Sequence, residues 1–556
     1  MDIKQYDNIE DFRDDLLEYF NLEKAYIQED IEASKELSFE QKIEEGLLIE
    51  SCKVVTEDNG IYLMDISENN TKLRTGDKAI FSDGKNEFKI QILENGTNQI
   101  KIVTETPLNT SSSYQLKVDQ CVMLDPYISL AEKIADGMAG ASWYKILLGL
   151  RKPKSIGSSS ISDTILIEKR EYLNDKEFKA YTEACHNPSV YCIQGPPGTG
   201  KTDVLGKIAS TYSSEGNEVL IICNTHTAVN NALNKISSIS GHLPMIKIGD
   251  ELKGEELDSK VVRCSTYNDY LNLRENRKKK TRAMKSNDII GMTLQAAAIN
   301  LGLCISNFSP SIILVDEAGQ IPFTQGSLIG SFKSNCIVLI GDDRQMPPIF
   351  HEKLKSHPFS ISLFTYIASK YPEAKTVLTT TFRMNKEITE FISECFYEPY
   401  GIHLESSDIS AKRCLSIPST TPDKRIVDIL TSTNSIHHIN VSLNDNWQDF
   451  NEEEALFIAK LAKEAINNGF KINQFAIITP YRRQVKAIRE AVINAIGVTC
   501  NSHLPLIDTV ERLQGQDVDM IVLSTSITDP TYFSSQRDFI LNLNRLNVMI
   551  HRAKMK

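Results

Sequence analysis

The chain has 556 residues, of which 24% are charged and 41% hydrophobic, and its formal net charge is −12. This length is enough for three or four domains, each with its own core. The acidic start at Met1–Asp7 lacks the apolar segment of a secretory signal, and the eleven cysteines form no C-x-x-C pair. These features argue against a secreted protein, a zinc ribbon or an iron–sulfur cluster, and they predict a cytoplasmic protein with reduced thiols.

The N-terminal segment, residues 1–50, is strongly acidic and is expected to be helical. It contains 16 acidic and five basic side chains, a net charge of −11, so the other residues sum to only −1. The charge of the whole chain therefore does not exclude a nucleic-acid partner. Apolar side chains at helical spacing predict the buried face of this segment: Phe12, Leu16, Leu17, Phe20 and Leu22.

Residues 51–121 have the pattern of a small β-barrel. Asn59-Gly60, Asp83-Gly84 and Asn95-Gly96 are dipeptides typical of hairpin turns, and short apolar runs such as Ile61–Leu63 lie between them. Closely spaced short strands of this kind favour a barrel. A helical pattern returns over residues 122–160, which end in a Gly/Ser-rich linker.

Beyond this linker, β-branched runs alternate with helical stretches, which predicts parallel sheets covered by helices on both faces. The region is too long for one such domain, so we expect two, at residues 161–365 and 366–556. The predicted strands are Tyr191–Ile193, Val219–Ile222, Ile312–Val315, Ile337–Ile340, Phe475–Ile478 and Met520–Leu523.

Residues 289–315 carry no formal charge and resemble a membrane span in that respect alone. Polar side chains such as Gln295 and Asn300 interrupt the apolar run, and Pro310 follows. We therefore expect a helix followed by a buried strand, and no contact with a membrane.

A phosphate-binding loop is the clearest functional motif of the chain. Its spacing is G-x-x-x-x-G-K-[ST], and its glycines let backbone N–H groups surround the phosphates of a nucleotide. Lys201 would bind the β- and γ-phosphates, and the hydroxyl of Thr202 would ligate Mg²⁺. The predicted nucleotide-binding residues of this loop are Gly195, Pro196, Pro197, Gly198, Thr199, Gly200, Lys201 and Thr202.

Two carboxylates follow a predicted strand, at Asp316 and Glu317. Asp316 would hold the metal, directly or through water, and Glu317 would orient and deprotonate the attacking water. An Asp-Glu pair at a strand end is also common as a capped turn, but its position after the phosphate-binding loop favours hydrolysis.

Three further polar residues complete the predicted hydrolytic site. Gln345, in Gly341-Asp342-Asp343-Arg344-Gln345-Met346-Pro347-Pro348, could sense the γ-phosphate through its amide, although an ordinary turn is the alternative. Arg383 and Arg552 lie in the second half of the chain, where arginine fingers that reach the γ-phosphate are expected.

These motifs, in this order, closely resemble those of superfamily 1 helicases, in particular the 1B branch that includes the nonsense-mediated-decay RNA helicase and the immunoglobulin-mu-binding helicase. The resemblance runs from about residue 173 to 554. It implies two RecA-like domains, preceded by a helical stalk and a β-barrel accessory domain. It assigns the hydrolytic site to Lys201, Thr202, Asp316, Glu317, Gln345, Arg383 and Arg552.

The same resemblance suggests contacts with the base, the ribose and the nucleic acid. Leu173-Asn174 opens the adenine-reading motif, Phe382 would stack on adenine, with core packing as the alternative, and Asp517 would contact the ribose. The predicted nucleic-acid contacts are Asn224, Thr225, His226, Thr293, Pro480, Tyr481, Thr509 and Val510. Residues 236–287 match a helical insertion, and its basic run, Arg274–Lys285, is either a nucleic-acid contact or a solvated face.

The chain departs from the family at several positions. Glu177 replaces the glutamine that reads adenine, and a carboxylate cannot donate to N7, so discrimination against GTP is expected to be relaxed. Thr381 replaces a glutamine, and Arg482 and Arg483 replace Glu-Gly, either as phosphate contacts or as solvent-exposed residues. The family continues into another strand after its last arginine motif, whereas this sequence stops at Lys556, so we expect a further C-terminal part.

The resulting hypothesis is an ATP-dependent helicase or translocase that moves 5′-to-3′ along single-stranded RNA or DNA and uses ATP with Mg²⁺. The alternative is a nucleotide-switched clamp that binds nucleic acid or a partner without unwinding. In either case, the acidic N-terminus could dock a protein partner.

Overall fold

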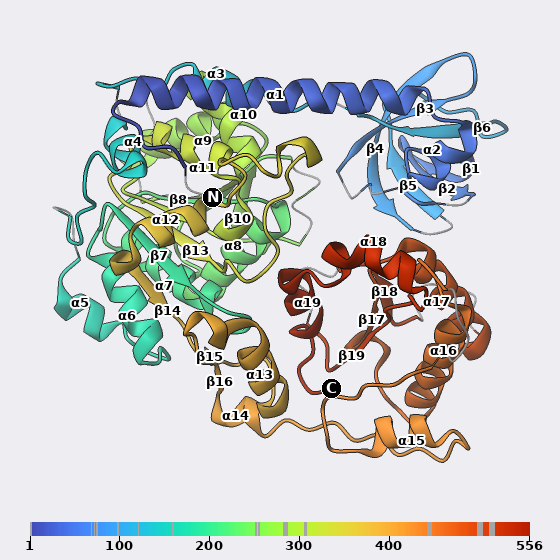
Figure 1. Cartoon of the computed structure of the whole chain (residues 1–556). Coiled ribbons are helices and arrows are strands. Elements are labelled where there is room, and N and C mark those ends of the chain that lie inside the picture. Colours follow the sequence, from blue (N-terminus) through green and yellow to red (C-terminus); the bar gives the residue numbers. More distant parts are fainter. Residues whose placement is uncertain are drawn as a thin grey trace.

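The computed structural model describes residues 3–556, except for 68, 72, 74, 75, 97, 98, 121, 139, 158–160, 251, 252, 254, 255, 282–286, 305–308, 442–446, 498–503 and 511–516. Figure 1 shows a long N-terminal helix, a β-barrel at one end of it, and two α/β units. The first unit packs against the other end of the helix, and the second lies below the barrel. The expected arrangement of two α/β units preceded by an N-terminal helix and a β-barrel is thereby confirmed.

The long helix α1 (Ile9–Lys35) begins where the side chain of Asn8 accepts a hydrogen bond from Asp11 N. Phe12, Leu16 and Phe20 are buried as predicted, and they pack into the core of the first α/β unit. Leu22 is exposed, contrary to the expectation, because it lies off this buried face. A short helix, α2 (Phe39–Glu44), then leads into the barrel.

The barrel is closed, with strand order β1-β2-β5-β4-β3-β6. Its interior is filled by alternate side chains such as Ile49, Phe81 and Ile102. The three predicted turn dipeptides lie at hairpin ends as expected, and the first strand starts at Leu48, slightly before the expected boundary. The strands are β1 (Leu48–Asp58), β2 (Ile61–Ile66), β3 (Lys78–Ser82), β4 (Glu87–Asn95), β5 (Gln99–Val103) and β6 (Ser113–Val118).

The chain returns from the barrel through α3 (Asp125–Ala131) and α4 (Ala141–Leu148), which pack beside α1. Trp143 anchors α4, because its ring N–H donates to the carbonyl oxygen of Ser327 at 2.8 Å. The helical prediction for this region is confirmed at both helices. Part of the predicted linker, residues 158–160, lies outside the described residues.

The first α/β unit is built on an eight-stranded sheet with order β10-β9-β11-β8-β12-β13-β7-β14. Alternate residues of the strands β7 to β13 enter two hydrophobic clusters, one on each face, so helices cover both faces. The strands are β7 (Val190–Gln194), β8 (Val219–Cys223), β9 (Met245–Ile248), β10 (Val261–Cys264), β11 (Ile289–Thr293), β12 (Ile312–Val315), β13 (Ile337–Gly341) and β14 (Lys375–Val377). The helices are α5 (Asp163–Glu168), α6 (Asp175–Cys185), α7 (Lys201–Ser214), α8 (His226–Ser240), α9 (Tyr267–Thr281), α10 (Leu294–Cys304), α11 (Phe323–Ser327) and α12 (Leu363–Lys370).

Three expectations about this unit need correction. The region 236–287, expected to be a helical insertion, contains β9 and β10, whose apolar residues extend the central sheet. The uncharged run begins with a strand, β11, before its helix and second strand. Finally, β14 pairs with β7, so the sheet of the first unit continues past the expected boundary at residue 365.

The second α/β unit has a three-stranded parallel sheet with order β18-β17-β19. Its strands are β17 (Phe475–Ile478), β18 (Leu506–Asp508) and β19 (Met520–Leu523), and a short pair, β15 (Thr380–Thr381) and β16 (Glu405–Ser406), lies at its start. The helices are α13 (Lys386–Ile392), α14 (Asp408–Ala411), α15 (Lys424–Thr431), α16 (Glu452–Asn467), α17 (Arg482–Ile496), α18 (Pro530–Ile540) and α19 (Leu543–Ile550).

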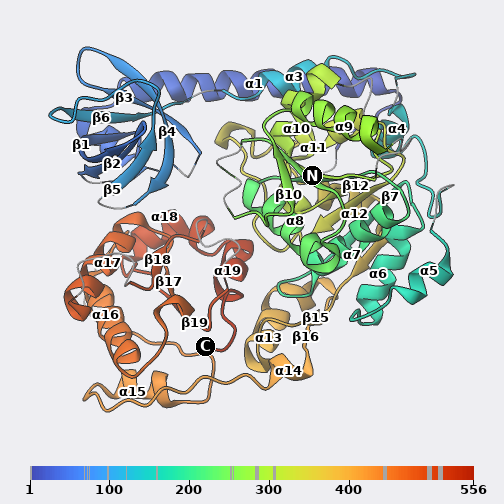
Figure 2. The ribbon, with the colours of Figure 1, turned by 180° about the vertical axis from the view of Figure 1, so that it is seen from behind.

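The barrel touches both α/β units. Lys253 of the first unit forms a 2.8 Å ion pair with Asp77, and Arg482 of the second donates to the carbonyl oxygen of Asn70. Figure 2 shows from behind that the barrel and the second unit lie on the same side of the long helix. Within the described part of the chain, every helix is too short or too polar to serve as a membrane-spanning segment.

Candidate nucleotide site and nucleic-acid interface

The phosphate-binding loop connects β7 to α7, as its motif predicts. Gly198 and Gly200 have φ angles of 72° and 78°, which only glycine adopts without strain. A Cβ atom on Gly198 would lie 2.4 Å from the Cβ atom of Arg383. The ammonium group of Lys201 donates to the carbonyl oxygen of Gly195 at 2.5 Å, so it lies inside the loop. The loop therefore depends on its glycines for its backbone shape, and its contact with a triphosphate stays a prediction.

The acidic pair lies at the end of β12, beside this loop. Asp316 is buried, and its Oδ1 accepts a hydrogen bond from Glu317 N at 3.0 Å. Burial and the neighbouring charge of Glu317 raise the pKa of Asp316, whereas Lys201 opposes the shift. Glu317 has a φ of 51°, a left-handed conformation that is uncommon for a side chain of this type.

These residues fit a bound Mg²⁺ ion. A buried carboxylate whose charge is costly is stabilised by a divalent cation, and carboxylate and hydroxyl oxygens are the ligands that Mg²⁺ prefers. Thr202, the other predicted ligand, lies in the first turn of α7, where the helix dipole favours the phosphates that the ion accompanies.

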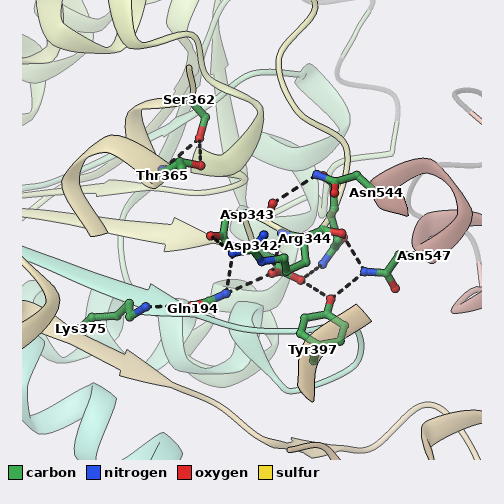
Figure 3. A network of polar contacts seen from close by, with 11 residues as sticks. Gln194, Asp342, Asp343, Arg344, Ser362, Thr365, Lys375, Tyr397, Asn544 and Asn547 are labelled. Atoms are coloured by element: carbon green, nitrogen blue, oxygen red, sulfur yellow. Dashed lines mark hydrogen bonds and ion pairs between the residues drawn. The ribbon is translucent and has the colours of Figure 1, made fainter. Parts of the chain in front are cut away.

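The loop after β13, residues 342–348, carries the predicted γ-phosphate sensor Gln345 and is called the sensor loop below. A polar network that crosses between the two α/β units holds this loop (Figure 3). The amide nitrogen of Gln345 donates to Asp342 Oδ2 at 2.8 Å. The side chain of Gln194, at the end of β7, donates to Asp343 at 2.7 Å and so connects the loop to the neighbouring strand. The loop is therefore fixed at the carboxyl ends of the central strands, where nucleotides bind in α/β sheets.

The two predicted arginine fingers meet at one carboxylate. Arg383 Nε lies 2.9 Å from one oxygen of Asp517, and Arg552 Nη1 lies 3.6 Å from the other. Burial and the charge of Arg383 lower the pKa of Arg552 to about 10, whereas Asp517 and Glu317 raise it. Asp517 thus pairs with both arginines here, and its contact with ribose stays a prediction.

The residue predicted to stack on adenine lies at the edge of the phosphate-binding loop. The backbone N–H of Phe382 donates to the carbonyl oxygen of Gly198 at 2.8 Å, and the hydroxyl of Thr381 donates to that of Pro197 at 2.9 Å. The side chain of Phe382 is 43% exposed, which does not fit the alternative of plain core packing. Its exposed ring supports stacking on a base.

Glu177 forms part of a capping box at the start of α6. Its Oε2 accepts from Asn174 N at 2.8 Å, and the side chain of Asn174 accepts from Glu177 N at 2.9 Å. The sequence Asn174-Asp175-Lys176-Glu177 carries the pattern of this motif, so the capping role could have been read in advance. Burial raises the pKa of Glu177, and its Oε1 lies beside Gly200.

We expect Glu177→Gln to raise the preference for ATP over GTP about fivefold, the effect of one neutral hydrogen bond. The glutamine carbonyl can keep the cap on Asn174, while its amide adds a donor for adenine N7. Steady-state kcat/KM values for the two nucleotides would measure this ratio. Glu183→Gln, on the same helix but outside the capping box, is the matched control; an unchanged ratio in Glu177→Gln would refute a base-reading role.

The first predicted strand-gripping motif lies between β8 and α8. The amide of Asn224 donates to the carbonyl oxygen of Gln320 at 3.4 Å, and the hydroxyl of Thr225 caps α8 by accepting from Ala228 N. His226 is half-buried, and burial together with Lys247 and Lys253 lowers its pKa to about 4. The imidazole is therefore neutral at physiological pH.

This shift predicts a loss of stability in acid. The folded pKa of His226 lies below the ordinary value of 6.5, so protons bind preferentially to the unfolded chain as the pH falls from 6.5 towards 4. Allowing for partial solvent access, we expect the free energy of unfolding of wild type to fall by about 1–2 kcal/mol more than that of His226→Gln over this pH range. Denaturant unfolding at pH 7 and pH 4.5 would measure the difference, with exposed His242→Gln as control. Equal losses in wild type and His226→Gln would contradict it.

The other predicted nucleic-acid residues are divided between the two units. Thr293 is buried and accepts from Ala296 N, and Val510 is buried in a core cluster, so neither side chain is presented to solvent. Tyr481 follows Pro480 and packs against the rings of Tyr532 and Phe539. Thr509 begins a motif whose next residues, 511–516, lie outside the described residues. Backbone contacts with nucleic acid stay a prediction for these positions.

The basic residues for which the sequence allowed either a nucleic-acid contact or a solvent-exposed position form contacts within the chain. Arg483 pairs with Asp449 at 2.8 Å, in addition to the contact of Arg482 with the barrel. In the basic run, Arg274 pairs with Glu218 and Arg277 with Asp288, both at 3.3 Å. These four residues therefore have structural contacts; the later side chains of the run lie outside the described part.

Two positioning residues were not predicted. The guanidinium of Arg413 donates to the carbonyl oxygens of Phe382 and Arg383, so it fixes the loop that carries the first finger. The amide of Asn385 donates to Met555 O at 3.1 Å, which connects this loop to the segment after the second finger. No local pattern marks Arg413, whereas Asn385 lies two residues after Arg383 and caps α13.

Comparisons with known proteins identify relatives of this chain. Two family models described as AAA domains match residues 179–351 and 359–556. A DNA replication ATP-dependent helicase/nuclease of Arabidopsis thaliana, JHS1, is 27% identical over 430 residues, which is 74% of this chain and 30% of that protein. The helicase/nuclease dna2 of Schizosaccharomyces pombe is 26% identical over 438 residues, 74% of this chain and 29% of that protein.

Helicase sen1 of Schizosaccharomyces pombe is 27% identical over 312 residues, 55% of this chain and 17% of that protein. The chain thus spans less than a third of the length of these relatives. The AAA matches cover both α/β units, and the relatives are named as helicases. By its two AAA matches and its helicase relatives, the chain is similar to the superfamily 1 helicases.

Proposed function

We propose that this chain is an ATP-driven motor that moves along single-stranded nucleic acid in the 5′-to-3′ direction of the 1B branch. The observation that carries the proposal is the convergence of Arg383 and Arg552 on Asp517, close enough to Glu317 for its charge to affect both arginines. Residues from both halves of the chain thus meet at one site, so hydrolysis can be coupled to motion between the two units.

The hydrolytic step would use the residues at this junction. Lys201 would bind the phosphates, and Glu317 would accept a proton from the attacking water. Mg²⁺ held by Thr202 and Asp316 would neutralise charge that develops on the phosphates. Arg383 and Arg552 would move from Asp517 to the γ-phosphate, and Phe382 would stack on the base.

Single-stranded DNA is our first choice of substrate, because two relatives are named DNA replication helicase/nucleases. RNA is the comparison substrate, since the proposed contacts grip a backbone that both polymers share. Glu29 and Asp30 of α1 already pair with Lys353 and His351 of this chain. A protein partner of the acidic N-terminus would therefore bind the other, exposed carboxylates of α1.

Displacement of a labelled strand tests this function. With ATP, we expect displacement from a duplex with a 5′ single-stranded tail and none from one with a 3′ tail. A clamp, the alternative reading, would hydrolyse ATP without displacing the strand. Displacement only from the 3′-tailed duplex would contradict the 1B assignment.

A further inference from the structure

A buried tyrosine of the second α/β unit donates into the loop that carries the proposed phosphate sensor. The hydroxyl of Tyr397 lies 2.6 Å from Asp342 Oδ2, and the side chain is fully buried. Tyr397 ends a π-helical turn, Ser393–Tyr397, a conformation that is rare and frequent at functional sites. Figure 3 shows Tyr397 pointing towards the sensor loop, beside Asn547.

The same carboxylate oxygen also holds the sensor. Gln345 Nε2 donates to Asp342 Oδ2 at 2.8 Å, so Tyr397 and Gln345 share one acceptor. The other oxygen, Oδ1, accepts from Arg344 N at 3.2 Å. Asp342 is buried, and a buried carboxylate oxygen that loses every donor is costly. If Gln345 turns towards a γ-phosphate, Tyr397 still satisfies Oδ2.

Tyr397 is in turn connected to the helix that precedes the second finger. Asn547, on α19, donates to the hydroxyl of Tyr397 at 3.0 Å and to the carbonyl oxygen of Arg344 at 2.8 Å. Asn544, on the same helix, donates to the carbonyl oxygen of Gln345 at 2.6 Å. Because α19 ends two residues before Arg552, the sensor loop and the arginine finger are joined through this network.

We propose that Tyr397 is a positioning residue that lets Gln345 exchange between Asp342 and the γ-phosphate. Through Asn547, Tyr397 also couples this exchange to the packing of α19 against the sensor loop. The inference rests on the proposed function, because that function assigns the γ-phosphate to Gln345. Without the hydroxyl, Oδ2 has Gln345 as its remaining side-chain donor, so the release of Gln345 becomes costly. ATP binding is unaffected, since the contacts of Lys201 and the phosphate-binding loop do not involve Tyr397.

The test is a double-mutant cycle on ATP hydrolysis by the full chain. We expect Tyr397→Phe to lower kcat about tenfold while KM for ATP changes less than about twofold, as expected for a hydrogen bond to a charged group that acts after binding. In a Gln345→Ala background, Tyr397→Phe should cause no further loss, because the residue through which it acts is absent. A merely structural role would give the same loss in both backgrounds.

Tyr371→Phe is the matched control, since the buried hydroxyl of Tyr371, in the first unit, also donates a 2.6 Å bond, to the carbonyl oxygen of Ile146 on α4. It should keep the wild-type kcat. Unchanged kcat in Tyr397→Phe, or equal losses with and without Gln345, would overturn the inference. The cycle can be measured on hydrolysis without nucleic acid, so a failure of nucleic-acid stimulation would refute the motor separately.

Discussion

Replacing Arg552 with alanine is expected to lower kcat for ATP by about 10³-fold or more, the size of effect that arginine fingers have in other P-loop enzymes. The side chain of Arg552 is only 8% exposed, and it lies where the charges of Arg383 and Glu317 act on it. Its guanidinium is therefore close to the acid that would activate water. Because ATP binding depends mainly on the phosphate-binding loop, KM should change much less than kcat.

Steady-state ATPase kinetics would measure this change, with thermal unfolding as a check on the fold. Arg425→Ala is a matched control, because Arg425 also belongs to the second unit and also pairs with an aspartate, Asp423. We expect it to hydrolyse ATP as wild type does. A folded Arg552→Ala protein with wild-type kcat would remove Arg552 from the hydrolytic site.

Glu317→Gln is expected to lower kcat by about 10²- to 10⁴-fold, the usual contribution of a general base. The substitution keeps the size of the side chain but removes its negative charge and its ability to accept a proton. Lys201 and the loop glycines are unchanged, so the affinity for ATP should stay close to that of wild type.

Single-turnover hydrolysis together with binding of a fluorescent ATP analogue would separate the two effects for Glu317→Gln. Glu373→Gln, an exposed carboxylate of the first unit, is the control. A loss of nucleotide binding that matched the loss of hydrolysis would show that Glu317 holds the nucleotide and does not activate water.

Much of the fold could be predicted because its signals are local. The strand Ile312–Val315 is a β-branched run between turn residues, and the barrel hairpins carry turn dipeptides at their ends. The strands β9 and β10 were missed because they are short and lie beside a basic run whose composition resembles a helical insertion. The strand β14 was missed because its pairing with β7 joins residues far apart in the sequence.

The candidate site was predictable where the residues that act together are close together in the sequence. The loop from Gly195 to Thr202 needs its glycines for backbone shape, and Asp316 and Glu317 follow directly from a strand end. The partners of these residues were not predictable, because they depend on how distant segments pack. Asp517 meets two arginines, and Tyr397 meets Asp342 across 55 positions of sequence. Glu177 was read as a base contact alone, although the capping pattern was present.

The most direct test of the central claim is the rate of ATP hydrolysis with and without single-stranded nucleic acid, DNA and RNA side by side, at two salt concentrations. A motor whose two units close on ATP while they grip a strand should hydrolyse faster when the strand is present, and the stimulation should weaken at the higher salt because phosphate contacts are screened. Stimulation by DNA, RNA or both is the result that this account predicts. Hydrolysis that responds to neither polymer at either salt concentration would contradict it.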